Sequence, residues 1–172
     1  MVFNFLSFQS AWFVAVNMQQ QGLLILLVIL VSHFVLSQHR GRDFLTLISI
    51  TLIGSLVDLS ASYIGLFSFK DGLILPFWLI LLWANFSLTF HYSMLWLKRV
   101  PIMIQAILGG VFGCFSYFAA YKLGAVDYPF GETLTILGLI VIWSVSLPLY
   151  VVIANQIKGK YDEQYSHALC IK

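Results

Sequence analysis

Apolar residues fill most of the chain in long runs that are separated by short polar breaks. The runs cover residues 4–17, 22–38, 44–68, 73–97, 101–123 and 133–157. Apart from the shorter first run, they approach or exceed the ~20 residues that a helix needs to cross a bilayer. Turn-sized breaks favour antiparallel neighbours. The pattern predicts an all-α membrane bundle of about six transmembrane helices, forming one integral-membrane domain over residues 1–172.

Polar or small residues recur at helical spacing in three of these runs, so we expect them to face protein rather than lipid. The fourth run carries Trp78, Leu82, Asn85, Thr89, Tyr92 and Trp96 at steps of three and four. The third carries Thr51, Ser55, Asp58, Ser62 and Gly65 in the same spacing. In the fifth, Gly109 and Gly113 form a G-x-x-x-G step, which lets two helix backbones approach closely. We expect the three stripes to pack on one another.

Composition and charge support a membrane protein and give it an orientation. Hydrophobic residues make up 60% of the chain and charged residues 9%, against about 25% charged residues in soluble domains. No basic cluster suggests a nucleic-acid partner. Seven of the nine Lys and Arg residues lie in the second break, the fourth break and the tail: Arg40, Arg42, Lys98, Arg99, Lys158, Lys160 and Lys172. The positive-inside rule then predicts that both termini are cytoplasmic, N-in/C-in.

Asp58 is a carboxylate expected near the middle of the membrane, where a charge is expensive and needs a reason. One interpretation is a group that binds a proton or a substrate. The other is a protonated side chain that joins two helices by a hydrogen bond. Depth in the membrane makes Asn85 and Thr89 the donors that we expect beside it.

Two histidines are expected at similar depth near cytoplasmic helix ends, His33 and His91, with Gln9 and Gln105 in the same leaflet. They could line a polar cavity open to the cytoplasm and hold a haem or a metal. We favour the alternative that each histidine caps a helix end or reaches the surface, because two histidines on separate helices have no spacing signature. We therefore predict no metal site and no cofactor.

The order of several motifs resembles a known family. These motifs are Phe8-Gln9 with Trp12-Phe13, Asp58, Leu75-Pro76 with Trp78, Leu82-Trp83, Thr89 with His91 and Ser93, Trp96-Leu97, Gly109-Gly110, Ser116-Tyr117 and Lys122-Leu123-Gly124. They resemble the proteobacterial inner-membrane proteins grouped as domain of unknown function 2878. The resemblance implies a multi-pass protein of the bacterial inner membrane. Its members are often encoded beside lipid-modifying and oxidative-stress functions, which favours a role around membrane lipids.

Three functional hypotheses follow. The first is an accessory membrane protein that binds a lipid or a hydrophobic small molecule in the bundle. Its expected site residues are Asp58, Asn85, Thr89, His91, Gln9, His33 and Gln105. The second is the substrate-binding membrane subunit of a small-solute importer, and the third is a membrane enzyme or haem protein that uses His33 and His91. Because the chain lacks G-x-S-x-G, P-loop and H-E-x-x-H motifs, we favour a non-catalytic role. Besides the bilayer, we expect a homo-oligomer or a second membrane protein as partner.

Overall fold

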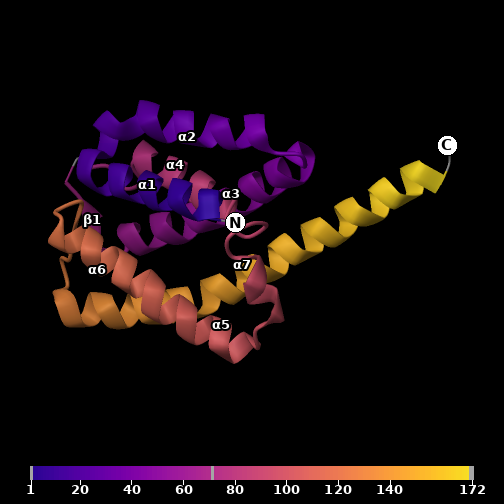
Figure 1. Cartoon of the computed structure of the whole chain (residues 1–172). Coiled ribbons are helices and arrows are strands. Elements are labelled where there is room, and N and C mark those ends of the chain that lie inside the picture. Colours follow the sequence, from indigo (N-terminus) through magenta and orange to yellow (C-terminus); the bar gives the residue numbers. More distant parts are fainter. Residues whose placement is uncertain (1, 71, 171–172) are drawn as a thin grey trace.

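Helices dominate the computed structural model of the chain, which describes residues 2–70 and 72–170 (Figure 1). The α-helices are α1 (Val2–Met18), α2 (Leu23–Leu36), α3 (Arg40–Tyr63), α4 (Phe77–Ser87), α5 (Ile102–Leu108), α6 (Cys114–Lys122) and α7 (Glu132–Cys170). Two 3-10 segments, η1 (Gln19–Gly22) and η2 (Leu95–Arg99), and a π-helical segment, η3 (Gly109–Gly113), complete the helical elements.

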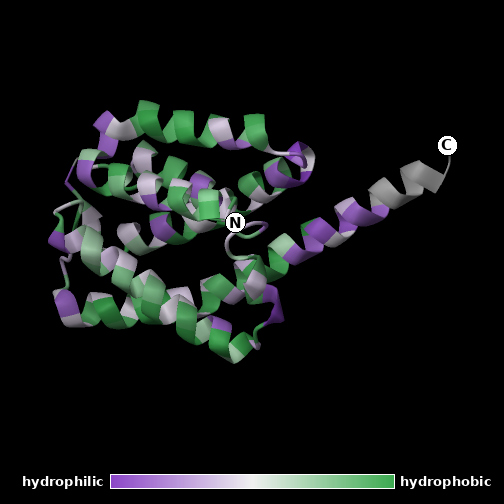
Figure 2. Cartoon of the chain, in the orientation of Figure 1, coloured by the Kyte–Doolittle hydropathy of each residue, from purple (hydrophilic) through white to green (hydrophobic). Residues whose placement is uncertain are grey.

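The predicted all-α class is confirmed, and its helices are apolar enough for a membrane bundle. Among the described residues, four stretches are long and apolar enough to cross a membrane: 2–36, 40–63, 102–122 and 132–163. In the first stretch the chain reverses at η1, where Gln19 has φ 48°, so that α1 and α2 lie antiparallel (Figure 1). Apolar residues cover the outer faces of the helices, whereas polar residues gather at the ends of the bundle (Figure 2).

A short hairpin-like contact closes one end of the bundle. Strand β1 (Ser68–Phe69) pairs antiparallel with β2 (Val126–Asp127), so the segment after α3 is joined to the segment after α6. Tyr121 and Tyr128 stack in the same region, with ring centroids 4.3 Å apart. The sequence pattern predicts a third helix that continues to residue 68, but α3 ends at Tyr63.

The prediction of one continuous helix over 73–97 is wrong. Helix α4 ends at Ser87, residues 88–94 form turns, and η2 follows. The hydroxyl groups of Ser87 and Thr89 donate to the carbonyl oxygens of Ala84 and Phe86 at 2.7 and 2.6 Å. Such local bonds compete with the helical ladder. The polar stripe therefore does not continue along a single helix face beyond Ser87.

The glycine face of the fifth run packs on α7, not on the stripes of α3 and α4 as expected. A Cβ on Gly109 would lie 2.3 Å from the carbonyl oxygen of Trp143, and one on Gly113 would lie 2.2 Å from the indole of Trp143. That indole stacks on the indole of Trp83 from α4, with centroids 5.6 Å apart and planes 10° apart. On the other side, Gly54 of α3 leaves room for Trp83, since a Cβ there would lie 2.4 Å from its ring. Small residues thus position the central pair of tryptophans.

We predict that Gly113→Ala lowers the free energy of unfolding by about 1–3 kcal/mol, because the added methyl group overpacks the core against Trp143. Gly159→Ala is the matched control, since nothing lies within 4 Å of its added Cβ, and alanine is the better helix former. Unfolding midpoints in mixed detergent micelles measure both. An unchanged midpoint for Gly113→Ala would show that the close approach of η3 and α7 does not depend on this glycine.

Candidate functional site

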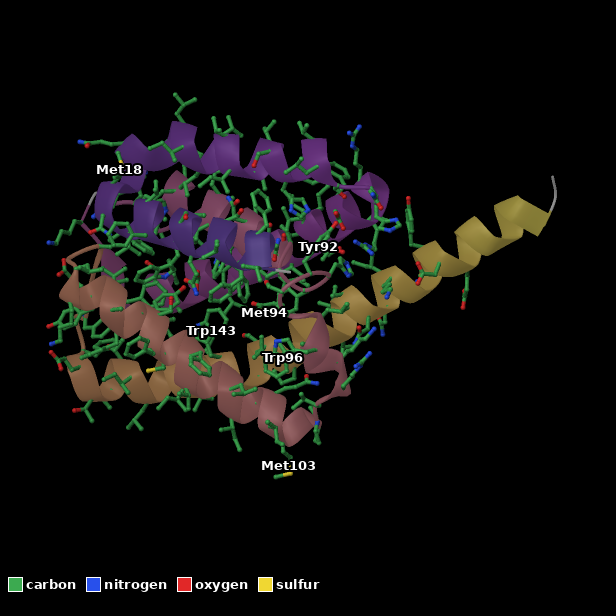
Figure 3. All side chains as sticks on the ribbon, in the orientation of Figure 1. Met18, Tyr92, Met94, Trp96, Met103 and Trp143 are labelled. Atoms are coloured by element: carbon green, nitrogen blue, oxygen red, sulfur yellow. The ribbon has the colours of Figure 1, made fainter. Side chains whose placement is uncertain are left out.

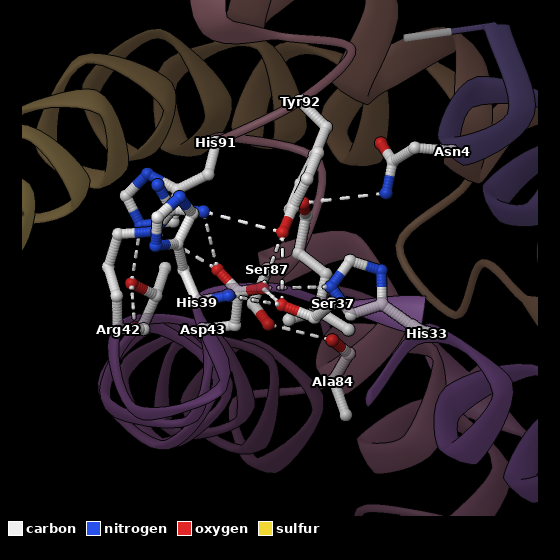
Figure 4. Close-up of polar contacts among 12 residues, drawn as sticks. Asn4, His33, Ser37, His39, Arg42, Asp43, Ala84, Ser87, His91 and Tyr92 are labelled. Atoms are coloured by element: carbon white, nitrogen blue, oxygen red, sulfur yellow. Dashed lines mark hydrogen bonds and ion pairs between the residues drawn. The ribbon is translucent and has the colours of Figure 1, made fainter. Parts of the chain in front are cut away.

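A buried polar network lies where the end of α2, the start of α3 and residues 88–94 meet (Figure 4). At its centre is Asp43, in the first turn of α3, whose side chain is fully buried. A carboxylate is favourable in the first turn of a helix because of the helix dipole. Burial without partners would still be costly, so the network depends on what surrounds this carboxylate.

Both carboxylate oxygens of Asp43 are hydrogen-bonded. The guanidinium group of Arg42 donates to Oδ1 from Nε and Nη2, at 3.1 and 2.8 Å. The hydroxyl groups of Ser37 and Tyr92 donate to Oδ2, each at 2.6 Å, and Nε2 of His33 lies 3.2 Å from the same oxygen. Asp43 thereby links the α2–α3 turn to residues 88–94, which we call the broken segment.

His91, from the turns at residues 88–94, contacts α3 one turn beyond Asp43. Its Nε2 lies 2.7 Å from Oγ1 of Thr46, and Thr46 itself donates to the carbonyl oxygen of Arg42 at 3.0 Å. The imidazole therefore donates through Nε2.

The broken segment and η2 after it receive further side-chain partners from α1 and α5. Oδ1 of Asn4 accepts bonds from the hydroxyl and the amide of Ser93, at 2.7 and 3.3 Å. Nε2 of Gln105 donates to the carbonyl oxygens of Leu97 and Val100, at 3.0 and 2.8 Å. Irregular backbone at membrane depth is tolerated where protein surrounds it and satisfies its polar groups. Asn4 and Gln105 meet that requirement here.

Asp58 lies deep in the bundle, 3% exposed, but with different partners from those expected. Nε1 of Trp83 donates to its Oδ2 at 2.6 Å, and the hydroxyl of Tyr117 is a second hydrogen-bonding group beside it. Asn85 instead donates to the carbonyl oxygens of Leu81 and Leu26, at 2.9 and 3.4 Å. Thr89 bonds within its own turn. Asp58 thus joins α3 to α4 and α6.

The residues expected to form one ligand site are therefore distributed over several places. His33 and His91 both reach the first turns of α3, whereas Asp58 lies among the central aromatic rings and Gln9 is exposed on α1. Sequence reasoning missed Asp43 and Asn4. Asp43 follows two arginines in a short polar break, where nothing in the sequence marks a side chain as buried. Among the described residues, no three His, Cys, Asp or Glu side chains could hold a metal ion together.

An apolar groove of about 650 Å³ lies on the outside of the bundle, between α5–η3–α6 and α7. Its lining residues are Ile107, Gly110, Val111, Phe112, Cys114, Phe115, Phe118, Ile136, Ile140 and Ser144. Gly110 allows η3 to approach α7 closely at the floor of the groove, because a Cβ there would lie 2.5 Å from Oγ of Ser144. Near one end, the ammonium group of Lys122 lies 5.0 Å from the ring centroid of Phe118 and donates to Glu132 at 2.7 Å. The groove is apolar along its length and charged at that end.

We predict that Asp43→Asn lowers the free energy of unfolding by about 3–5 kcal/mol, because it leaves the buried charge of Arg42 without its counter-ion. Asp162→Asn removes a carboxylate from an exposed position and is expected to change stability by less than about 0.5 kcal/mol. Chemical unfolding of both variants in the same detergent gives the comparison. Equal stabilities would contradict the central role of Asp43.

Comparison with known proteins gives one match. The sequence pattern of the family described as "Protein of unknown function (DUF2878)" matches residues 1–149. No curated protein and no solved structure matches the chain. The match covers most of the chain, including α1 to α6, the broken segment, the Asp43 network and the groove. The chain therefore belongs to the DUF2878 family of proteins of unknown function.

Proposed function

We propose that this protein is a non-catalytic accessory protein of the bacterial inner membrane. In this role it holds an acyl chain of a lipid, or a comparable hydrophobic molecule, in the groove between α5–η3–α6 and α7. The observation that carries the proposal is the groove itself, with a volume of about 650 Å³ and an almost wholly apolar lining. Ligand pockets of this size are mostly apolar with a few polar groups, and Ser144 is such a group here.

The surroundings of the groove favour an acyl chain. Both walls belong to helices that are long and apolar enough to cross a membrane. Phe112 and Phe115 are each 66% exposed at the surface of the bundle, where the solvent is then hydrocarbon. A lipid chain would therefore enter the groove from the side.

The charged end of the groove suits an amphiphile. The ion pair of Lys122 with Glu132 marks the level at which α6 ends and α7 begins. Interfacial aromatic rings are typical of this level, and Tyr121 contributes one, 4.9 Å from the ammonium group. A lipid lying in the groove would place its headgroup here and its chain along Phe118 and Phe115.

We further propose six crossings with both termini in the cytoplasm. In this arrangement α1 and α2 cross separately, and α4 together with residues 88–99 forms one broken crossing. The reversal at Gln19 supports the first pair. The polar partners of residues 88–99 support the broken crossing, because unpaired backbone would not be stable in hydrocarbon. This topology puts the α2–α3 turn, η2 and the end of α7 on the cytoplasmic side.

We predict that a photoactivatable diacyl phospholipid, cross-linked to the full-length protein in native membranes, forms adducts concentrated on residues 107–118 and 136–144. Ile140→Trp, which fills the groove, should reduce these adducts severalfold, because the indole occupies the volume of the chain. Val141→Trp is the control. Val141 is the next residue on α7, is 66% exposed and does not line the groove, so adducts should persist. Peptide mass spectrometry of the cross-linked protein gives the distribution.

Two results would contradict the proposal. One is an even distribution of adducts around the bundle, including the smaller groove of about 420 Å³ between α3 and α7. The other is an unchanged yield in Ile140→Trp. Unfolding midpoints of both tryptophan variants distinguish loss of binding from loss of folding.

A further inference from the structure

Basic residues gather at the end of the bundle that is opposite β1 and β2. They come from the start of α3, from η2 and from the part of α7 that extends beyond the bundle (Figure 1). Besides Arg42, which is paired with Asp43, they are Arg40, Lys98, Arg99, Lys158 and Lys160. Among the described residues, the acidic groups of the same end are Asp43, Asp162 and Glu163. The net charge of this end is therefore positive.

The three segments are held together by packing. The ring of Tyr161 in α7 covers the start of α3, where a Cβ on Gly41 would lie 3.2 Å from it. Segment η2 packs against α7. The side chain of Gln105 donates to the carbonyl oxygens of Leu97 in η2 and of Val100 directly after it. The basic side chains thus come from segments that pack on one another.

Four of these five cations are exposed: Arg40, Lys98, Arg99 and Lys160. Trp96 directly precedes Leu97, Lys98 and Arg99 and is 48% exposed. By contrast, Trp83 in the core is 4% exposed. Figure 3 shows Trp96 at the junction of η2 with α7. An exposed tryptophan beside cations is typical of the level of lipid headgroups.

Helix α7 also leads out of the membrane at this end. Its 39 residues extend about 58 Å at ~1.5 Å per residue, against about 30 Å of hydrocarbon. Lys158 and Lys160 follow the last apolar turn, so they lie where α7 meets the headgroups. The polar extension of the helix is visible in Figure 2.

We infer that this end, formed by Arg40, Lys98, Arg99, Lys158, Lys160 and Trp96, binds the phosphate groups of anionic phospholipids. The site goes beyond the proposed function, because it lies apart from the groove and selects lipids by the charge of the headgroup. It rests on the membrane placement proposed above. Basic residues near an anionic leaflet each strengthen binding about fivefold, and salt weakens the effect.

The test uses the full-length protein reconstituted in phosphatidylcholine, with spin-labelled phosphatidylglycerol or phosphatidylcholine as probe. The measured quantity is the association constant of the anionic probe relative to the zwitterionic one. We expect the wild type to prefer phosphatidylglycerol severalfold, and the preference to fall when the salt concentration is raised. Lys98→Gln/Arg99→Gln should lose most of it.

Matched variants make the outcome specific. Arg99→Gln and Lys70→Gln each remove one positive charge, but Lys70 lies at the end with β1 and β2, so only the first should reduce the preference. Ile140→Trp should lower occupancy of the groove without changing the preference, which separates this site from the proposed function. Equal preferences in wild type and Lys98→Gln/Arg99→Gln, or no preference in wild type, would overturn the inference.

Discussion

The structure depends on one constraint: a peptide backbone that leaves its helix inside an apolar bundle must find hydrogen-bond partners elsewhere. Residues 88–94 are such a backbone, and buried residues surround them. Asn4 accepts from the amide and hydroxyl of Ser93, and in the segment that follows, Gln105 donates to the carbonyl groups of Leu97 and Val100. These partners come from α1 and α5, so the break in the fourth segment fixes the positions of helices distant in the sequence.

The two buried carboxylates of α3 show different solutions to the same problem. Asp43 has a guanidinium group and three further donors, which suits an ionised group at the end of a helix. Asp58 has Trp83 and Tyr117 as partners, both uncharged, and no basic partner among the described residues. Each joins three segments of the chain. Their partners lie within the protein, which is why we place ligand binding in the groove and not around these carboxylates.

Much of the fold follows from apolar periodicity. The all-α membrane class, the separate second, third, fifth and sixth segments, and the close approach at Gly109 and Gly113 could be derived from runs and spacing. The break after Ser87 could not, because residues 73–97 are apolar enough for a continuous helix. Local bonds of Ser87 and Thr89 compete with the helix at this point. Asn4, Thr46 and Asp43, which are distant in the sequence, then bond to Ser93, His91 and Tyr92. The predicted polar stripe from Trp78 to Thr89 and Tyr92 required one continuous helix, but α4 ends at Ser87, before Thr89 and Tyr92.

The candidate site shows the same limit. His33 and His91 were recognised as residues of one depth, and both contact α3. Asp43 escaped notice because a polar break between apolar runs is ordinarily solvated. The groove left no sequence signal either, since its lining differs from other lipid-facing surfaces only in shape, which depends on Gly110 and on the packing of α6 against α7.

Hydrogen–deuterium exchange of the amides of residues 88–97 in the folded protein tests this account most directly. The amides of Thr89, Tyr92, Ser93 and Met94 all donate within the protein. They should therefore exchange as slowly as those of α4, and Asn4→Leu should accelerate exchange at Ser93 in particular. Exchange of residues 88–94 as fast as in an exposed loop, or a rate at Ser93 that Asn4→Leu leaves unchanged, would contradict a broken segment held by buried side chains.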